Sequence, residues 1–350
     1  MRAAVFHELG KPLQIETVAK PQAGPGEIVL KVHYCGVCGS DLHATHPGVF
    51  VVPDGTILGH EFAGEIVESG APGWKVGDAA TALPNNACEE CRTLGLGECK
   101  EHLGIMCPRN TLTGFHPSAQ GAYAEYVKFS AKEALRLPSA VKSREGAAVE
   151  PLAVGLHAVN RGKVTVGERV LILGGGPIGL AVAVFAKLAG ARDVVLSEFA
   201  PARREAAGAM GATAAIDPSK EEVGEAFARK AGGPPDVIFE CVGAPGMIQK
   251  AIDLSRPYGR IVVVGVCMVE DTTTPISAIF KETNIQYVLG YGRPDWRLVL
   301  DLLDSGRVDP RPMITDTVAL EELPAAFEAL RKPTTQIKVM VRPNEPGGSL

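Results

Sequence analysis

The chain has 350 residues, of which 46% are hydrophobic and 21% charged, and its formal net charge is −5. This length predicts about two domains, and the balance of apolar and charged residues excludes an intrinsically disordered chain. Because no run of basic residues occurs, neither nucleic acid nor a membrane surface is an expected partner. The N-terminal residues do not resemble a secretion signal, so we expect a cytoplasmic protein with reduced cysteines.

Short strands broken by Gly and Pro are predicted for about the first 150 residues. Ile28–Val32, Phe62–Glu68 and Tyr123–Val127 are rich in β-branched or aromatic residues and lie near turn-forming residues. Such strands favour a mainly β, partly barrel-like unit with long loops.

From about residue 152, apolar runs of strand length alternate with stretches typical of helices. These ranges are Arg169–Leu173, Gly179–Ala189, Asp193–Leu196, Ala202–Met210, Val237–Phe239 and Arg260–Val264. The alternation predicts an α/β fold with a doubly wound parallel sheet. The apolar stretch Val170–Ala186 contains four Gly and a Pro and is shorter than a membrane span, so we expect a strand, a turn and a helix start.

The alternation ends near residue 290. Arg297–Leu303 and Leu323–Leu330 are predicted as helices, and Ile337–Val341 as a closing strand. We therefore expect one domain from residues 1–151 and 290–350, interrupted by a second domain from residues 152–289.

A glycine-rich turn follows the first strand of the predicted parallel sheet. Its residues are Gly174, Gly175, Gly176, Pro177, Ile178 and Gly179. This G-x-G-x-x-G lies between a predicted strand and a predicted helix, the context of a dinucleotide-binding turn. Gly174 permits the tight turn, Gly176 lets the backbone approach a pyrophosphate, and Gly179 allows close packing of the helix. The helix N-terminus then offers N–H groups to the phosphates, whereas the alternative is a plain glycine turn.

The cofactor preference depends on Glu198, which ends the next predicted strand 19 residues after Gly179. A carboxylate there accepts hydrogen bonds from the ribose hydroxyls and repels a 2′-phosphate, which favours NAD over NADP. Arg203 and Arg204 follow closely, and an arginine can accommodate that phosphate, so NADP stays open as the weaker alternative.

Four cysteines fall within one loop-like segment: Cys88, Cys91, Cys99 and Cys107. Four thiolates in a reducing compartment form a closed, tetrahedral structural zinc site. Four unligated surface cysteines are the alternative.

A second group of potential zinc ligands is dispersed along the chain. It comprises Cys38, His60, Glu61 and Glu150. One thiolate, one imidazole and one carboxylate leave a zinc ion with an exchangeable fourth position. Asp41 is a candidate partner that orients His60, and Ser40 and His43 are candidates for passing a proton outward. Each residue also has an ordinary structural explanation, so the prediction depends on their coincidence with a dinucleotide fold.

Together these motifs resemble the zinc-containing medium-chain alcohol and polyol dehydrogenases over essentially the whole chain. The similarity is carried by residues 36–43, 59–64, 150–152 and 174–179 and by the four-cysteine lobe. Residues 150–157, EPLAVGLH, are most similar to the sorbitol and butanediol dehydrogenase branch. The resemblance implies a GroES-like catalytic domain over residues 1–151 and 290–350, and an NAD-binding Rossmann domain over residues 152–289.

The resemblance also implies the chemistry and the assembly. Cys38 and His60 are expected to bind a catalytic zinc, with either Glu61 or Glu150 as the third ligand, and Ser40 and His43 match the family's proton relay. The expected reaction is hydride transfer between NAD and a secondary alcohol, diol or polyol. A homodimer or homotetramer joined through the cofactor domains is expected.

One departure and two alternatives remain. The family's lobe usually reads C-x2-C-x2-C-x7-C, whereas this chain has C-x2-C-x7-C-x7-C, so five residues are inserted after Cys91. A zinc-free quinone or enoyl reductase on the same scaffold would lack the Cys38 and His60 pair. A non-catalytic relative would have no need of Ser40, His43 and every candidate ligand.

Overall fold

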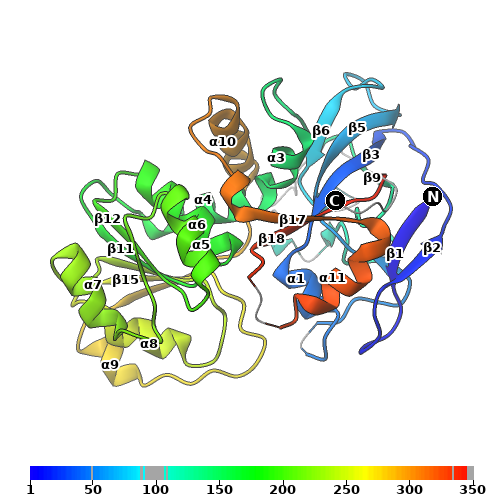
Figure 1. The fold of residues 1–350 in the computed structure, drawn as a ribbon. Coiled ribbons are helices and arrows are strands. Elements are labelled where there is room, and N and C mark those ends of the chain that lie inside the picture. Colours follow the sequence, from blue (N-terminus) through cyan, green and yellow to red (C-terminus); the bar gives the residue numbers. More distant parts are fainter. Residues whose placement is uncertain (49, 87–89, 91–105, 108, 333–334, 345–350) are drawn as a thin grey trace.

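The computed structural model describes residues 1–48, 50–86, 90, 106–107, 109–332 and 335–344. Its two halves differ in architecture, because one holds a helix-covered parallel sheet and the other holds mainly antiparallel strands (Figure 1). The C-terminal strand returns to the antiparallel half and lies beside strands from the beginning of the chain (Figure 1).

The parallel sheet has six strands in the order β13-β12-β11-β14-β15-β16. The strands are β11 (Arg169–Leu173), β12 (Asp193–Ser197), β13 (Ala214–Ile216), β14 (Val237–Glu240), β15 (Arg260–Val263) and β16 (Asn284–Tyr287). The helices of this half are α4 (Val149–Gly162), α5 (Pro177–Leu188), α6 (Pro201–Ala209), α7 (Val223–Ala231), α8 (Met247–Leu254) and α9 (Pro275–Ile279). The next helix, α10 (Arg293–Asp304), packs into the same core as α4. The strand order, read in chain order as 3-2-1-4-5-6, is that of a Rossmann fold.

Successive strand residues face opposite sides of this sheet, as the period of two requires. Val170 and Ile172 of β11 belong to the core that includes α4 and α5. Leu171 and Leu173 belong to a second core, which includes α7 and α8. Because both faces are covered there, the central strand β11 is buried without alternation from Val170 to Leu173.

The antiparallel half contains a sheet in the order β10-β6-β5-β3-β18-β17, with β9 also paired to β3, and a smaller sheet β2-β1-β4. The strands are β1 (Arg2–Phe6), β2 (Gln14–Thr17), β3 (Glu27–Gly36), β4 (Thr56–Ile57), β5 (Glu61–Ser69), β6 (Ala79–Ala82), β9 (Tyr126–Ser130), β10 (Ala134–Arg136), β17 (Ile314–Ala319) and β18 (Lys338–Arg342). The smaller elements are α1 (Gly39–Ala44), β7 (Asn85–Asn86), β8 (Thr111–Leu112), α3 (Ser143–Ala147), the 3-10 turns η2 (Arg311–Met313) and η3 (Leu320–Glu322), and α11 (Leu323–Ala329).

The predicted α/β fold class is confirmed, as is the division of Val170–Ala186 into a strand, a glycine turn and a helix start. Within the described part of the chain, the helices are too short or too polar to cross a membrane.

The strand predicted at Tyr123–Val127 is misplaced, because β9 begins at Tyr126. Tyr123 instead lies before that strand and is fully buried. Of the cysteines outside the predicted sites, Cys35 is buried, whereas Cys241 and Cys267 are only half-buried.

Candidate metal centre and cofactor site

Three potential metal ligands converge at one end of the antiparallel sheet. One ligand atom from each of Cys38, His60 and Glu61 lies within 4.8 Å of the other two. Zinc bonds of about 2.0–2.3 Å in a tetrahedron separate ligand atoms by roughly 3.3–3.8 Å, so small side-chain adjustments bring this cluster onto one ion. A thiolate, an imidazole and a carboxylate are also the ligand types that zinc accepts.

The local folding of α1 places Cys38. Cys38 is the N-cap of this six-residue helix, two residues after the end of β3, and Asp41 at the N3 position accepts a hydrogen bond from the Cys38 N–H at 3.1 Å. Glu61 is the first residue of β5, the strand that pairs with β3, and His60 directly precedes it. The cluster therefore forms where the end of one strand meets the start of its neighbour.

A glycine makes room for the Glu61 side chain. In the β3–β5 ladder Gly36 is the direct partner of Glu61. A Cβ atom at position 36 would collide with Oε2 of Glu61. Any larger residue at this position would therefore push the carboxylate away from Cys38 and His60.

A buried lysine from the far end of the chain neutralises Glu61. Nζ of Lys338, at the start of β18, donates to both Glu61 carboxylate oxygens at 2.7 Å and to the carbonyl oxygen of Val37 at 2.9 Å. Burial opposes its charge, but the Glu61 carboxylate outweighs burial and raises the pKa of Lys338 above its usual range. Sequence reasoning missed this residue, although a lysine inside the predicted strand Ile337–Val341 was a signal.

Asp41 lies behind His60 and is fully buried. Its Oδ1 lies 3.3 Å from Nδ1 of His60, within ion-pair range, although the two atoms are not aligned for a hydrogen bond. Its Oδ2 accepts a 2.6 Å hydrogen bond from the Tyr123 hydroxyl. Burial opposes ionisation of Asp41, but the His60 charge and these hydrogen bonds lower its pKa below the usual range. Likewise, burial works against protonation of His60, yet Asp41 raises the pKa of His60 well above its usual range.

The second candidate carboxylate, Glu150, lies in the first turn of α4 and is 8% exposed. It does not belong to the cluster of three ligand atoms. Burial, opposed by the His60 charge and by a hydrogen bond from Tyr291, raises the pKa of Glu150 to about 7. Tyr291, which sequence reasoning did not identify, is itself buried and packs edge-on against Trp296.

Ser40 and His43 both lie on α1. The Ser40 hydroxyl donates to Sγ of Cys38 at 3.2 Å, and His43 is exposed one helical turn further on.

Two aromatic side chains, Phe115 and Phe50, lie next to the ligand cluster on the side of His60. The Phe115 ring lies 5.1 Å from the His60 ring, and the Phe50 ring 6.0 Å from that of Phe115. The two rings thus form an apolar surface that begins beside His60.

The glycine turn has the geometry of a dinucleotide-binding loop. Gly174 has φ of +101°, a conformation that favours glycine. At Gly179 a Cβ atom would collide with the Gly174 carbonyl oxygen, so the third glycine lets the turn close. Gly176 is the N-cap of α5, and Pro177 and Ile178 begin the helix, whose first N–H groups are available to an anion.

Glu198 is anchored at this turn. Its Oε2 accepts from the Gly175 N–H at 2.7 Å and its Oε1 from the Ala200 N–H at 2.8 Å. Arg203 donates to the Gln336 carbonyl oxygen at 2.9 Å and lies 3.9 Å from Glu198. Arg204 donates to the Glu198 carbonyl oxygen at 2.7 Å and pairs with Asp217. Both guanidinium groups are thus already engaged.

Most of the predicted four-cysteine lobe lies outside the described residues. This applies to Cys88, Cys91 and Cys99, whereas Cys107 is described and is buried.

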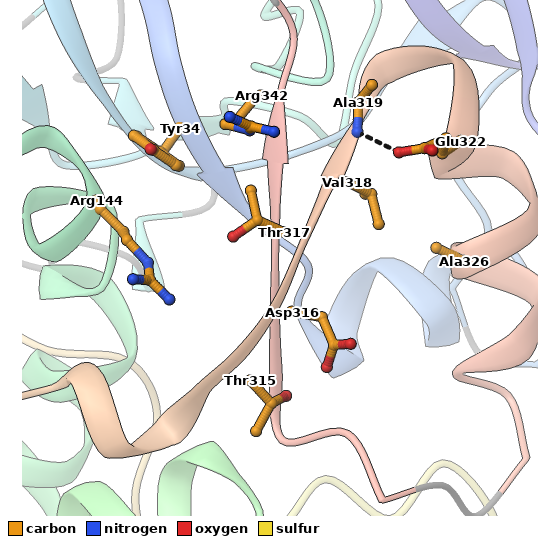
Figure 2. A pocket seen from close by; sticks show the side chains of 10 residues that line it. All are labelled: Tyr34, Arg144, Thr315, Asp316, Thr317, Val318, Ala319, Glu322, Ala326 and Arg342. Carbon is orange, nitrogen blue, oxygen red and sulfur yellow. Dashed lines mark hydrogen bonds between the residues drawn. The ribbon is translucent and has the colours of Figure 1, made fainter. Parts of the chain in front are cut away.

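A cavity of about 640 Å³ lies along β17, but its lining contains none of the three ligands (Figure 2). Tyr34, Arg144 and Arg342 lie on one side of it, and Glu322 accepts a hydrogen bond from the Ala319 N–H at 2.8 Å (Figure 2). Its volume therefore says nothing about the size of a molecule bound at the metal centre.

Each half of the molecule matches a known protein family. Residues 24–139 match the alcohol dehydrogenase GroES-like domain, and residues 177–305 match the zinc-binding dehydrogenase family. The chain belongs to this family of oxidoreductases, which use zinc and a nicotinamide cofactor.

Individual relatives cover the whole length. The (R,R)-butanediol dehydrogenase of Bacillus subtilis is 33% identical over 98% of this chain and 100% of its own length. A crystal structure of 2R,3R-butanediol dehydrogenase from that organism has a TM-score of 0.87 at 32% identity, covering 98% of this chain and 99% of the other. The sorbitol dehydrogenase of Gallus gallus is 33% identical over 97% of this chain and 96% of its own. A zinc-binding dehydrogenase of Sinorhizobium meliloti 1021, solved with NADP, has a TM-score of 0.86 at 31% identity, covering 98% and 99%.

Proposed function

We propose that this protein transfers hydride between NAD and a secondary alcohol, diol or polyol, and reduces the corresponding ketone in the reverse direction. The observation that carries the proposal is the convergence of Cys38, His60 and Glu61 in a chain that also contains a dinucleotide-binding turn. We assign the metal chemistry to residues 1–151 and 290–350, and cofactor binding to residues 152–289.

In this proposal Cys38, His60 and Glu61 hold a catalytic zinc ion, and Glu150 is the alternative third ligand. Three protein ligands leave one position open, as in catalytic zinc sites. When bound, zinc supplies a Lewis acid for the alcohol or carbonyl oxygen. Asp41 orients His60 through Nδ1, and Lys338 balances the Glu61 charge while holding the carboxylate beside Cys38.

Ser40 and His43 would move the proton that alcohol oxidation releases. The Ser40 hydroxyl lies 3.2 Å from the Cys38 sulfur, next to the ligand cluster, and can both accept and donate a proton. His43 is exposed, and its pKa is lowered by partial burial and by His46, so it is neutral and able to accept a proton at neutral pH. In this order the proton would pass from the substrate hydroxyl, beside the ligand cluster, toward solvent.

NAD is the proposed cofactor because of the anchored carboxylate of Glu198. Two backbone N–H groups hold it at the edge of the glycine turn, where it would repel a 2′-phosphate. Arg203 and Arg204 are engaged by Gln336, Asp217 and backbone oxygens, so binding a phosphate would require these contacts to break.

A second, structural zinc ion is proposed for the lobe of Cys88, Cys91, Cys99 and Cys107. Its support is the sequence pattern together with the burial of Cys107. Thiolate ligands require reduced cysteines, which the cytoplasm maintains, and we propose that compartment for the protein.

A homodimer or homotetramer is proposed through the cofactor-binding half. Strand β16 is an edge of the parallel sheet, and the large side chains around it are exposed: Ile279 by 63%, Phe280 by 81%, Tyr287 by 62% and Leu289 by 54%. An apolar edge strand is an association surface unless it is covered. Light scattering coupled to size-exclusion chromatography measures the subunit number.

The substitution Cys38→Ser tests the proposed chemistry. We expect turnover to be abolished while NAD still binds, because the cofactor turn lies on other elements. Metal analysis should find about two zinc ions per wild-type chain and about one in the variant. Cys267→Ser, at a half-buried cysteine outside the cluster, is the matched control. Normal turnover of the Cys38→Ser protein with any diol or secondary alcohol would contradict the proposal.

A further inference from the structure

Tyr123 lies directly behind the candidate zinc ligands and is 0% exposed. Its N–H donates to the Leu58 carbonyl oxygen at 2.9 Å, and that of Ala122 donates to the Gly59 carbonyl oxygen at 2.8 Å. The segment around Tyr123 is therefore paired with the residues that lead into His60. None of the proposed steps uses this side chain.

The hydroxyl of Tyr123 fixes the Asp41 carboxylate. Its 2.6 Å hydrogen bond to Oδ2 has the length of a charge-assisted O–H···O⁻ bond. The Cys38 N–H donates to the same oxygen at 3.1 Å, which leaves Oδ1 facing His60. Burial, followed by the Asp41 charge, raises the pKa of Tyr123 well above its usual range, so the hydroxyl stays a donor.

The ring of Tyr123 packs against the backbone before His60. Gly59 has φ of +93°, and a Cβ atom there would lie 2.6 Å from Cδ1 of the ring. On another side the Phe327 ring meets Tyr123 edge-on, with 6.4 Å between centroids. The ring is thus held between two neighbours, and its hydroxyl lies 2.6 Å from Asp41 Oδ2 and 3.5 Å from the Gly36 carbonyl oxygen, so Asp41 is the nearer acceptor.

We propose that Tyr123 is a positioning residue of the zinc centre, acting on His60 through Asp41. The inference rests on the proposed function, because it assigns a purpose to the geometry of that centre. Asp41 Oδ1 lies 3.3 Å from Nδ1 of His60, within ion-pair range. A carboxylate at the second nitrogen of a zinc-bound histidine sets the orientation of the ring, and loss of such a partner typically weakens metal affinity or activity by about 10- to 100-fold. An ordinary core tyrosine would instead affect stability and leave zinc affinity unchanged.

The test measures zinc affinity of Tyr123→Phe by chelator competition, together with the absorption spectrum of the cobalt-substituted protein. We expect zinc to bind about 10- to 100-fold more weakly and the cobalt spectrum to shift. Tyr126→Phe is the matched control, because it removes a hydroxyl three residues away, where the half-buried ring packs under Lys20. Its zinc affinity should equal that of the wild type.

The variant Asp41→Asn completes a double-mutant cycle. If Tyr123 acts through Asp41, the double variant binds zinc no more weakly than Asp41→Asn alone. Zinc affinity of Tyr123→Phe within twofold of the wild type overturns the proposal, as do losses that multiply in the double variant. If Tyr123→Phe does not fold, Asp41→Asn decides: weakened zinc binding supports the proposal and unchanged binding overturns it. A wild-type protein whose zinc content equals that of Cys38→Ser would refute the proposed zinc centre itself.

Discussion

Replacing Lys338 by methionine should destabilise the zinc-free protein strongly. Lys338 is 2% exposed and its ammonium group is bonded to both oxygens of Glu61, which is 0% exposed. Methionine keeps most of the side-chain volume but leaves the Glu61 charge buried without a partner. Breaking a buried pair in this way costs about 3–5 kcal/mol. With an unfolding entropy of about 2.1 cal/mol/K per residue, the 350 residues give about 1.4 °C per kcal/mol, so the melting temperature should fall by about 4–7 °C.

Saturating zinc should reduce the difference in melting temperature between Lys338→Met and the wild type if Glu61 is a zinc ligand. The size of that reduction therefore distinguishes Glu61 from Glu150 as the third ligand. If Glu61 binds the metal, the ion supplies the positive charge that the variant lacks, so the difference in melting temperature between variant and wild type should shrink when zinc is saturating. If Glu150 is the third ligand, the difference should remain. Differential scanning calorimetry of zinc-free and zinc-saturated samples measures both quantities.

Two control variants test whether the destabilisation comes from the buried Lys338–Glu61 ion pair. Lys128 is 39% exposed and lies 3.0 Å from Glu27, and Lys128→Met should cost less than about 1 kcal/mol. The double variant Lys338→Met/Glu61→Gln removes both charges and should recover part of the stability that Lys338→Met loses. A zinc-free Lys338→Met protein that melts like Lys128→Met would refute the buried ion pair.

Two further predictions concern charge elsewhere. Glu198→Ala should improve the use of NADP relative to NAD, measured as the ratio of kcat/KM values, and an unchanged ratio would argue against its role. His7 hydrogen-bonds Glu16 and Asp54, each at 2.6 Å, which raises its pKa above the usual value near 6.5. Its contribution is therefore complete below pH 6.5 and disappears as the pH rises through the folded-state pKa. Melting curves of the wild type and His7→Gln should differ at pH 5.5 and converge at alkaline pH, with a gap that stays below about 1 kcal/mol because the site is partly exposed. A pH-independent gap would contradict this.

The parts of the fold that depend on local pattern could be predicted from sequence. β11 has the predicted bounds Arg169–Leu173, because an apolar run followed by glycines permits few other structures. The strand predicted at Tyr123 was misplaced, because its aromatic and β-branched residues are as suitable for a buried loop that pairs with Leu58 and Gly59. Residue type alone does not distinguish these two environments.

Some residues of the candidate site could be identified from the sequence, whereas others could be identified only from the structure. Cys38, His60 and Glu61 are unusual residue types in a recognisable spacing, and one ligand atom from each lies within 4.8 Å of the other two. Gly36 is one of 40 glycines, and its importance appears only when the strand register sets it opposite Glu61. Tyr123 could not be distinguished from other aromatic core residues, because its role depends on the position of Asp41.

Topology explains why these residues meet. Strand β3 lies between β5 and β18 and is antiparallel to both, so the C-terminal end of β3 adjoins the N-terminal ends of its two neighbours. Cys38 lies two residues after the end of β3, Glu61 begins β5 with His60 just before it, and Lys338 begins β18. The ligands and their balancing cation are therefore brought to one edge by a single strand order. Moving Lys338 by one residue along β18 would turn its side chain to the opposite face of the sheet, away from Glu61.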